Sequence, residues 1–355
     1  MTSKDSGTAV YHSERKVIKF AESLESNMNA FFFGAGCSCG TLGDECPTAA
    51  KFGARVLAND PNWKEHYKKL SELIEVHLNA DICELGLEEI WTFIDYYCKF
   101  HDAFPTPALY DLIPELKSAL LSVYGGPIDR KAHKLKPTEA FTLSAVLRQV
   151  EPGDAVISFN YDTLVERFAL SRGLDLRSFS KELRSDVVNF AKPHGSTSWC
   201  LDLEQKCVTH AHPDGAPLLE SLTPAHVSNG REPLVLGAVP IKSELLREVQ
   251  SYYKVDQVFD VIMRQWTAVI QSVKKAERIV VVGYSFPRED HYGRFLFAEA
   301  MKLRSENLPF IEFFETCDRA AERSAAIRET FSPRNSPSVS QVLYKGSVQA
   351  ADPSS

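Results

Sequence analysis

Short, mainly apolar runs of residues recur along this chain and predict buried strands. They fall at 31–33, 155–159, 187–191, 279–282 and 310–314. Runs without alternating polar positions are typical of strands that are covered on both faces, as in a parallel sheet. Helical spacing separates several of them, most clearly at 255–276. The pattern therefore predicts an α/β fold, in which a Rossmann-like parallel sheet carries helices on both faces.

Between the first and second apolar runs, the pattern is helical almost throughout residues 48–136. Apolar residues keep a period near 3.6 along three stripes, at 70–78, 87–98 and 109–120. This predicts a helical subdomain inserted into the α/β fold. We interpret its aromatic residues first as core, and a lid or an oligomer surface is the alternative.

The remaining boundaries follow from the composition. Residues 1–47 are expected to form the first part of the Rossmann-like domain, and 137–330 the remainder. Serine and proline become frequent beyond 331, which predicts a flexible tail at 331–355, apart from a short apolar segment at 342–344.

Charge and composition narrow the possible partners. The formal net charge is −7 and hydrophobic residues make up 44% of the chain, so we expect a substantial core and no direct binding of nucleic acid. No apolar run approaches the ~18 residues that a membrane-spanning helix needs, and the first residues do not resemble an export signal. We therefore expect a cytoplasmic protein, with no membrane association. The eight cysteines, none in Cys-x-x-Cys spacing, indicate reduced thiols.

Residues 171–186 look variable, and a second stretch, 201–232, is rich in proline, histidine, aspartate and glycine and is expected to be irregular. Four residues in or next to the second are possible metal ligands: Cys200, Cys207, His210 and His212. Their spacing matches no standard zinc module, so we expect no metal site.

The first apolar run ends in the sequence Gly34-Ala35-Gly36-Cys37-Ser38. Glycines at such a place let the backbone turn tightly and approach a ligand, and a helix that begins there directs its free N–H groups at a phosphate. The third glycine of the usual dinucleotide fingerprint is absent, because Cys39 occupies its position. A simple strand-to-helix connection is therefore the alternative.

Three later apolar runs also end in polar or glycine-containing sequences. Asn160 and Asp162 follow one strand, His194 stands between Pro193 and Gly195 after another, and Gly283-Tyr284-Ser285 follows a third. Ligands of open α/β sheets bind at the carboxyl ends of the strands, so these groups are candidates for one site. Alternatively, Asp162 caps a helix, Asn160 fixes a turn, and His194 is an ordinary buried polar residue. Glu315, after the last strand, is a candidate acceptor for ribose hydroxyls.

Taken in order, these four sequences resemble the motifs of the sirtuin-like family, the proteins related to silent information regulator two. Classical members carry Gly-Ala-Gly-x-Ser, Gln-Asn-Ile-Asp, His-Gly and Gly-Thr-Ser. The variants in this chain are similar to the divergent bacterial branch that acts in anti-phage defence and consumes NAD+. The four-cysteine zinc module of classical members is missing, and with it much of the domain that forms their acyl-lysine groove.

The resemblance implies a role for each motif. Gly34, Ala35, Gly36 and Ser38 would hold the pyrophosphate of NAD+, and Asn160 would orient the ribose or a water molecule. His194 would act as general base, and Asp162 would position the nicotinamide carboxamide. A second group of residues would complete the nucleotide site: Gly195, Ser196, Gly283, Tyr284, Ser285 and Glu315.

The activity implied by the resemblance is NAD+ hydrolysis to ADP-ribose and nicotinamide, without a metal. An unregulated NADase would harm its host, so we expect a resting state that is held by the helical insertion, by a homo-oligomer, or by a separate regulatory or sensor protein. The alternatives are an NAD-dependent protein deacylase or ADP-ribosyltransferase, and a non-catalytic module that senses NAD or ADP-ribose.

Overall fold

The computed structural model of the protein covers most of the predicted strands. It describes residues 28–43, 46–100, 109–136, 140–179, 181–209, 217, 219–236, 257–286, 290–304, 309–314 and 342–344. The site candidate Glu315, the possible metal ligands His210 and His212, and most of the tail lie outside these residues. No helix in the described stretches is both long and apolar enough to cross a membrane.

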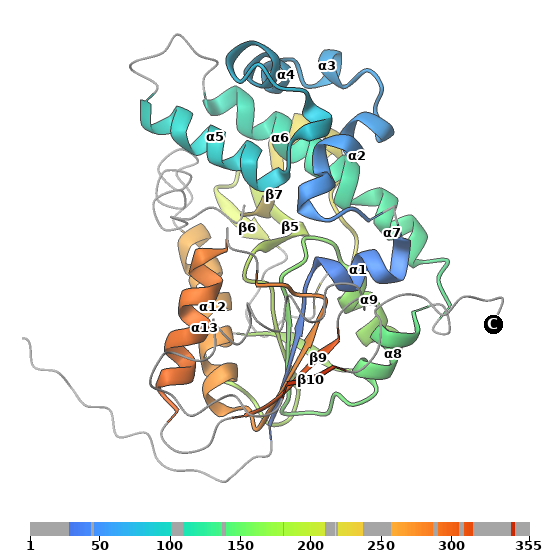
Figure 1. Ribbon diagram of the computed structural model, residues 1–355, viewed down its shortest axis with the longest axis vertical. Helices are drawn as coiled ribbons and strands as arrows, with labels where there is room; N and C mark the ends of the chain where they lie inside the picture. The colour runs from blue at the N-terminus through green and yellow to red at the C-terminus, as the bar shows by residue number, and fades with distance from the viewer. Residues whose placement is uncertain are drawn as a thin grey trace, which may run out of the picture.

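A parallel sheet forms the centre of the molecule (Figure 1). Its strands are β1 (Asn29–Phe33), β2 (Ala155–Ser158), β3 (Leu176–Ser178), β4 (Val188–Ala191), β8 (Arg278–Val282), β9 (Phe310–Phe314) and β10 (Val342–Tyr344). They are ordered β10-β9-β8-β1-β2-β4-β3, and every neighbouring pair is parallel.

Strand β1 lies between β2 and β8, with Phe32 opposite Ile157 on one side and Val281 on the other. The three phenylalanines of β1 are completely buried, because helices cover both faces of the sheet. From β1 the chain first builds one half of the sheet and later returns to build the other half. The carboxyl end of β1 is therefore the point at which the strand order reverses, where such sheets bind their ligands.

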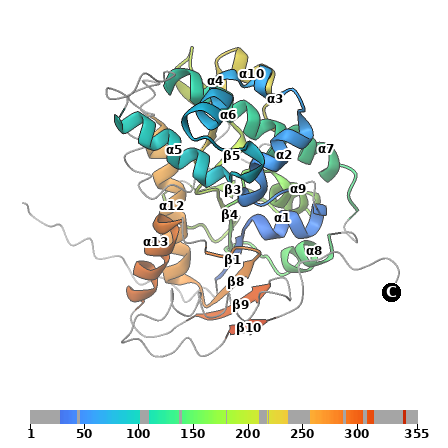
Figure 2. The same cartoon turned by 45° about the horizontal axis from the view of Figure 1, so that its top comes forward.

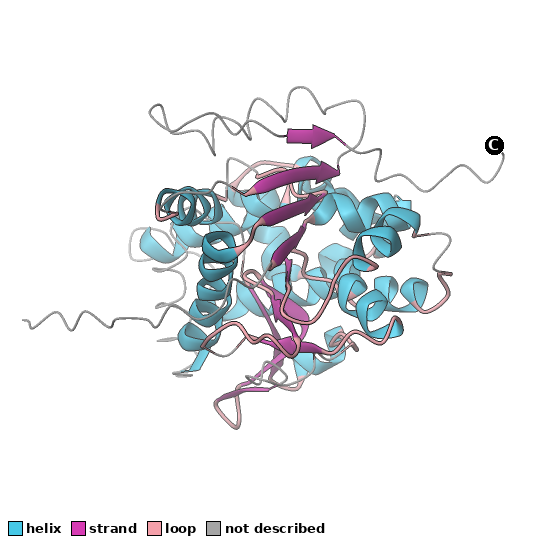
Figure 3. Cartoon of the chain, turned by 90° about the horizontal axis from the view of Figure 1, so that it is seen from below, coloured by secondary structure: helices cyan, strands magenta, loops and turns pink. Residues whose placement is uncertain are grey.

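Helices cover the two faces as the sequence predicts. Helices α12 (Gln257–Lys275) and α13 (His291–Lys302) lie on one face, and α1 (Ala35–Leu42), α8 (Phe141–Leu147) and α9 (Leu164–Ser171) lie on the other (Figures 1 and 3). Helix α12 buries its apolar stripe completely at Val258, Ile262, Val269 and Val273. The predicted α/β, Rossmann-like class is thus confirmed.

The segment between β1 and β2 is helical and lies beyond the carboxyl ends of the strands (Figure 2). Its elements are η2 (Ala49–Lys51), α2 (Phe52–Asn59), α3 (Trp63–His66), α4 (Lys68–Glu72), η3 (Leu73–His77), η4 (Ile82–Glu84), α5 (Leu87–Phe100), α6 (Leu109–Tyr124) and α7 (Gly126–Ala132). Helix α6 contacts α2, α4, α5 and α7. One hydrophobic core runs continuously from these helices into the sheet.

A second, antiparallel sheet lies between the main sheet and this helical segment (Figure 1). It consists of β5 (Gly195–Asp202), β6 (Cys207–Thr209) and β7 (Arg231–Val235), in the order β6-β5-β7, and the short helix α10 (Pro224–Ser228) packs on β7. The expectation of irregular structure at 201–232 was wrong for the described residues, which include β6 and α10. These strands are short and in part polar, so their pairing partners and not their own sequence pattern determine them.

A buried ion pair joins the helical segment to this second sheet. Lys117 Nζ on α6 lies 2.8 Å from Glu232 Oε2 on β7. Both side chains are at least 97% removed from solvent. The pair fixes α6 over the strand that lies beside β5.

Candidate functional site

The bend after β1 packs directly against the loop after β8. A Cβ atom added at Gly34 would lie 2.5 Å from Tyr284 Cα, and one added at Gly283 would lie 2.2 Å from the backbone nitrogen of Cys37. Gly283 also has a positive φ of +61°, a conformation that glycine adopts without strain. These glycines are therefore required by a contact between two backbones.

Two hydrogen bonds hold this contact together. The amide of Gly34 donates to Val282 O at 2.9 Å, and the amide of Gly36 donates to Gly283 O at 2.8 Å. The Gly36 amide is thus used within the protein. The Cys37 amide donates to Gly34 O at 2.9 Å, and the first turn of α1 reaches the surface at Ala35, which is exposed.

Asn160, at the carboxyl end of β2, reaches into the first turn of α1. Its Nδ2 atom donates to Ser38 Oγ at 2.9 Å, and the Ser38 hydroxyl in turn donates to the carboxylate of Asp162. Ser38 is fully buried and Asn160 is 5% exposed. Oδ1 of Asn160 has no hydrogen-bond partner within the described residues. A buried amide oxygen without a partner is an acceptor available to a ligand.

The Asp162 carboxylate lies in a buried, polar environment. Burial raises the pKa of Asp162, while Lys192, the backbone amide of Leu164 and Ser38 act in the opposite direction. Its Oδ1 accepts the Leu164 amide at 3.0 Å, at the start of α9. Thr163 is the N-cap residue of α9 and makes no side-chain cap hydrogen bond, so Asp162 closes a turn just before the helix and does not cap it.

Lys192 stands behind Asp162 and is completely buried. Its ammonium group donates to the backbone oxygen of Asp162 and lies 2.7 Å from Glu166 Oε1. Burial raises the pKa of the Glu166 carboxyl, and Lys192 opposes that shift. Lys192 thus ties the backbone of residue 162 to the Glu166 carboxylate on α9.

His194 lies in the turn between β4 and β5, and its imidazole contacts Asp290. Nε2 of His194 lies 3.1 Å from Asp290 Oδ2, and the hydroxyl of Tyr284 donates to the same oxygen at 2.6 Å. Asp290 is completely buried. Asp290 was not among the residues expected from the sequence. The signal available there was an aspartate just before a helical segment, which is typical of a helix cap and does not by itself indicate a site.

Aromatic rings bring the three later motifs together. Phe159 stacks on Tyr284 with ring centroids 4.0 Å apart and an interplanar angle of 4°. The His194 ring lies 5.3 Å from Phe159 and 6.3 Å from Tyr161. Asn160 stands between these two aromatic residues in the chain, so the amide and the imidazole belong to one neighbourhood beside the bend after β1.

The other predicted site residues occupy different positions. Gly195 has a φ of +81° and begins β5, where a Cβ atom would lie 2.1 Å from Leu234 O. Ser196 is fully buried, with its hydroxyl 2.9 Å from Ser198 Oγ. Ser285 is half-buried beside Tyr284. Gly195 and Ser196 thus shape the second sheet beneath the site.

The cysteines near the bend are thiols in apolar surroundings. Burial raises the pKa of Cys37 far above its ordinary value, and Cys39 donates a weak hydrogen bond to Cys46 O at 2.7 Å. Cys200 and Cys207 lie on adjacent strands, with Cys207 opposite Asp202. Among the described residues, no three histidine, cysteine or acidic side chains are grouped so that they could hold a metal ion.

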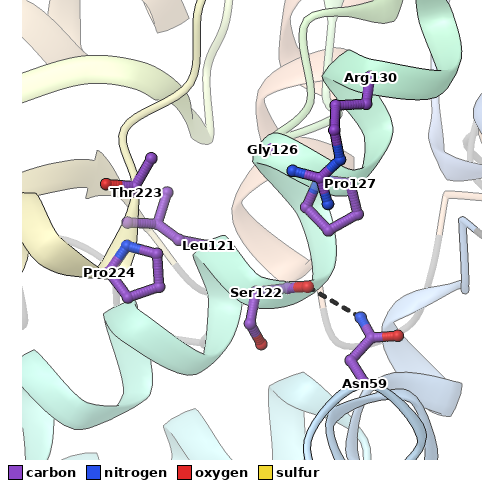
Figure 4. A pocket seen from close by; sticks show the side chains of 8 residues that line it. All are labelled: Asn59, Leu121, Ser122, Gly126, Pro127, Arg130, Thr223 and Pro224. Atoms are coloured by element: carbon purple, nitrogen blue, oxygen red, sulfur yellow. Dashed lines mark hydrogen bonds between the residues drawn. The ribbon is translucent and has the colours of Figure 1, made fainter.

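A pocket elsewhere on the surface is formed by α2, α6, α7 and the start of α10 (Figure 4). Eight residues line it: Asn59, Leu121, Ser122, Gly126, Pro127, Arg130, Thr223 and Pro224. The amide of Asn59 donates to Ser122 O at 2.8 Å across one side. None of the motif residues lines this pocket, so it is separate from the candidate site.

Helix α7 is connected to the candidate site through Asp129. The carboxylate of Asp129 accepts hydrogen bonds from Thr163 Oγ1 at 2.9 Å and from the Ser221 amide at 2.8 Å. It also lies 3.2 Å from Nη2 of Arg167. Thr163 directly follows Asp162, so the last helix of the inserted segment is anchored next to a motif residue.

No family model and no curated protein matches this chain. The arrangement of residues is therefore the basis for assigning a chemistry. It combines an exposed helix start, a buried amide oxygen that has no partner in the part of the chain that the structure describes, and a histidine that contacts a buried carboxylate. Such a set can bind an anion, accept a hydrogen bond from a hydroxyl or a water molecule, and accept a proton.

Proposed function

We propose that the protein is an NAD+ glycohydrolase, which converts NAD+ and water to ADP-ribose, nicotinamide and a proton. The observation that carries the proposal is the buried Oδ1 atom of Asn160, which has no partner among the described residues and lies next to the first turn of α1. That turn suits a diphosphate, and the amide oxygen suits a ribose hydroxyl or a water molecule held close by.

In this mechanism, the bond between nicotinamide and ribose breaks with the electron pair passing to the positively charged ring nitrogen. The leaving group is neutral, so the reaction needs positioning and stabilisation of the developing positive charge on the ribose more than acid catalysis. Asn160 orients the ribose or the attacking water. His194 accepts the proton that water loses, and an imidazole suits this role near neutral pH.

The order of the four motifs supports membership of the sirtuin-like family, in the bacterial branch that acts in anti-phage defence. The proposed role is that of an abortive-infection effector in the cytoplasm, which depletes NAD+ once it is triggered. Asp129 gives the inserted helices a direct connection to Thr163, and this supports control of the site by that segment. Control by a homo-oligomer or by a separate regulatory protein is part of the same proposal.

The test is turnover of NAD+ by the purified full-length chain, with nicotinamide and ADP-ribose quantified in the absence of any acceptor protein. Asn160→Ala and His194→Ala should each lower the rate by about 10²–10⁴-fold, the range that one acid–base or positioning group supplies. His66→Ala is the matched control, because His66 is exposed and lies on the outer helices. Equal turnover by the wild type and the two site variants would exclude this site.

The same experiment separates the alternatives. A deacylase or ADP-ribosyltransferase consumes NAD+ only in proportion to a modified protein, so NAD+ loss in buffer alone contradicts that activity. A sensing module binds NAD+ or ADP-ribose in a calorimeter and releases no nicotinamide over hours, and that result contradicts the hydrolase. The assay is run without and with the products of neighbouring genes, so that a required activator is present.

A further inference from the structure

The Asp290 carboxylate faces more hydrogen-bond donors than the capping of α13 requires. Its Oδ1 accepts the Gly293 amide at 3.1 Å, which caps α13. Its Oδ2 faces two donors from other parts of the chain, the Tyr284 hydroxyl after β8 and Nε2 of His194 after β4. Capping uses one oxygen, and the second oxygen is directed at the candidate site.

We infer that Asp290 is the positioning residue of this site, and that it holds the imidazole of His194 with its proton on Nε2. The inference rests on the proposed function for its catalytic consequence. An ionised carboxylate only accepts hydrogen bonds, so the nitrogen that faces it must carry the hydrogen. In the neutral ring, the lone pair that accepts a proton then lies on Nδ1. The carboxylate also stabilises the imidazolium that forms when this proton is taken up.

The surroundings keep both partners in this arrangement. Burial, followed by the charge of Asp290, raises the pKa of Tyr284 far above its ordinary value, so the phenol remains a donor. The Trp266 ring on α12 lies 5.8 Å from the imidazole, and the Phe159 ring lies 5.3 Å from it. The charged group on the next turn of α13 is Arg294, which acts electrostatically on Tyr284. These rings flank the imidazole, whose Nε2 faces Asp290.

Two substitutions separate the positioning role from the capping role. Asp290→Asn keeps the shape and the oxygen that caps α13, but presents an NH₂ group to Nε2 and to Tyr284. Asp290→Ser keeps a good helix cap and is too short to reach the imidazole. Tyr284→Phe keeps the stack on Phe159 and leaves the contact between His194 and Asp290.

The first readout does not depend on turnover. In the ¹⁵N spectrum of the full-length protein, neutral His194 should carry its hydrogen on Nε2 in the wild type and in Tyr284→Phe, and on Nδ1 in Asp290→Asn. A hydrogen on Nδ1 in the wild type overturns the inference. So does an Asp290→Asn variant that keeps the hydrogen on Nε2.

The second readout is kinetic. Asp290→Asn and Asp290→Ser should lower kcat by about 10²-fold or more, with KM for NAD+ changed by only a few-fold, because the positioned base acts in the chemical step. A raised KM with an unchanged kcat contradicts the positioning role. A wild type that shows the Nε2 hydrogen but cleaves no NAD+ leaves the positioning role standing and removes the proposed function.

Discussion

Nδ2 of Asn160 lies 2.9 Å from Oγ of Ser38, although 122 residues separate them in the chain. This hydrogen bond joins the carboxyl end of β2 to the first turn of α1. Ser38 also donates to Asp162, so one buried hydroxyl connects the two polar residues of that strand end. Its position indicates that Ser38 orients these side chains.

Ser38→Ala should lower the free energy of unfolding by about 1–3 kcal/mol, because it leaves a buried amide and a buried carboxylate without this partner. The measurement is equilibrium unfolding in urea. Ser171→Ala is the control, since Ser171 is exposed and its hydroxyl donates only to Phe168 O, and it should change stability by less than about 0.5 kcal/mol. Equal losses in the two variants would contradict the role of Ser38.

Gly283→Ala should be much more destabilising than Gly173→Ala. Both glycines have positive φ, at +61° and +78°, which costs an alanine about 1–2 kcal/mol. A Cβ atom at Gly173 meets nothing within 4 Å, whereas at Gly283 it would lie 2.2 Å from the Cys37 nitrogen. The overlap should add about 1–3 kcal/mol or more. Thermal and urea unfolding measure the difference, and similar values for both would mean that the two backbones are not in contact.

Asp154 should make stability decrease as the pH rises above about 4. Burial raises the pKa of its carboxyl, so the native state holds the proton more tightly than the unfolded state does. Once the pH passes the ordinary pKa of about 3.9, the carboxyl ionises first in the unfolded state, and the free energy of that state falls relative to the native state. This continues until the pH exceeds the raised pKa of the native state. The difference in unfolding free energy between wild type and Asp154→Asn should therefore fall across this window.

Asp186 provides the opposite control for this titration. Its hydrogen bond with Arg184 lowers the pKa of its carboxyl on the exposed surface. The difference in unfolding free energy between wild type and Asp186→Asn should rise with pH, because the Asp186 carboxylate forms at lower pH in the native state than in the unfolded state. Parallel pH profiles for the two variants would contradict the assignment for Asp154.

Breaking the ion pair between Lys117 and Glu232 should be costly from either side. Lys117→Met leaves a buried carboxylate without its cation, which costs about 3–5 kcal/mol. The double variant Lys117→Met with Glu232→Gln should recover most of that loss. The control is Lys302→Met, which removes an exposed pair with Glu299 and should cost less than about 1 kcal/mol. A double variant no more stable than Lys117→Met would contradict the pairing.

The strands of the main sheet were predictable where they are mainly apolar. Residues 279–282 are all apolar and buried, and 310–314 are apolar except for Glu312, so the local pattern indicates both strands. The edge strand β3 has three residues and is held by its pairing with β4. Strand β5 contains the polar sequence Gly195 to Ser198, whose burial depends on β7 and on the helices above it. Such non-local pairing leaves little trace in the local pattern.

The candidate site was predictable in its motifs and not in its contacts. Asn160 and His194 follow apolar strands, and the parallel sheet brings these strand ends to one edge. The partners of these residues come from elsewhere, because Asp290 lies 96 residues after His194. Helix α13 was not among the expected helices, and Asp290, the residue that caps it, was not singled out as a site residue. Glu315 lies outside the described residues and stays a prediction.

The contact between Gly36 and Gly283 is made by main-chain atoms only. No side-chain rotamer can lengthen or shorten it, so the distance between these two segments is set by strands β1 and β8. A shift of the bend after β1 relative to the loop after β8 therefore requires strands β1 and β8, which pair along their whole length, to move apart.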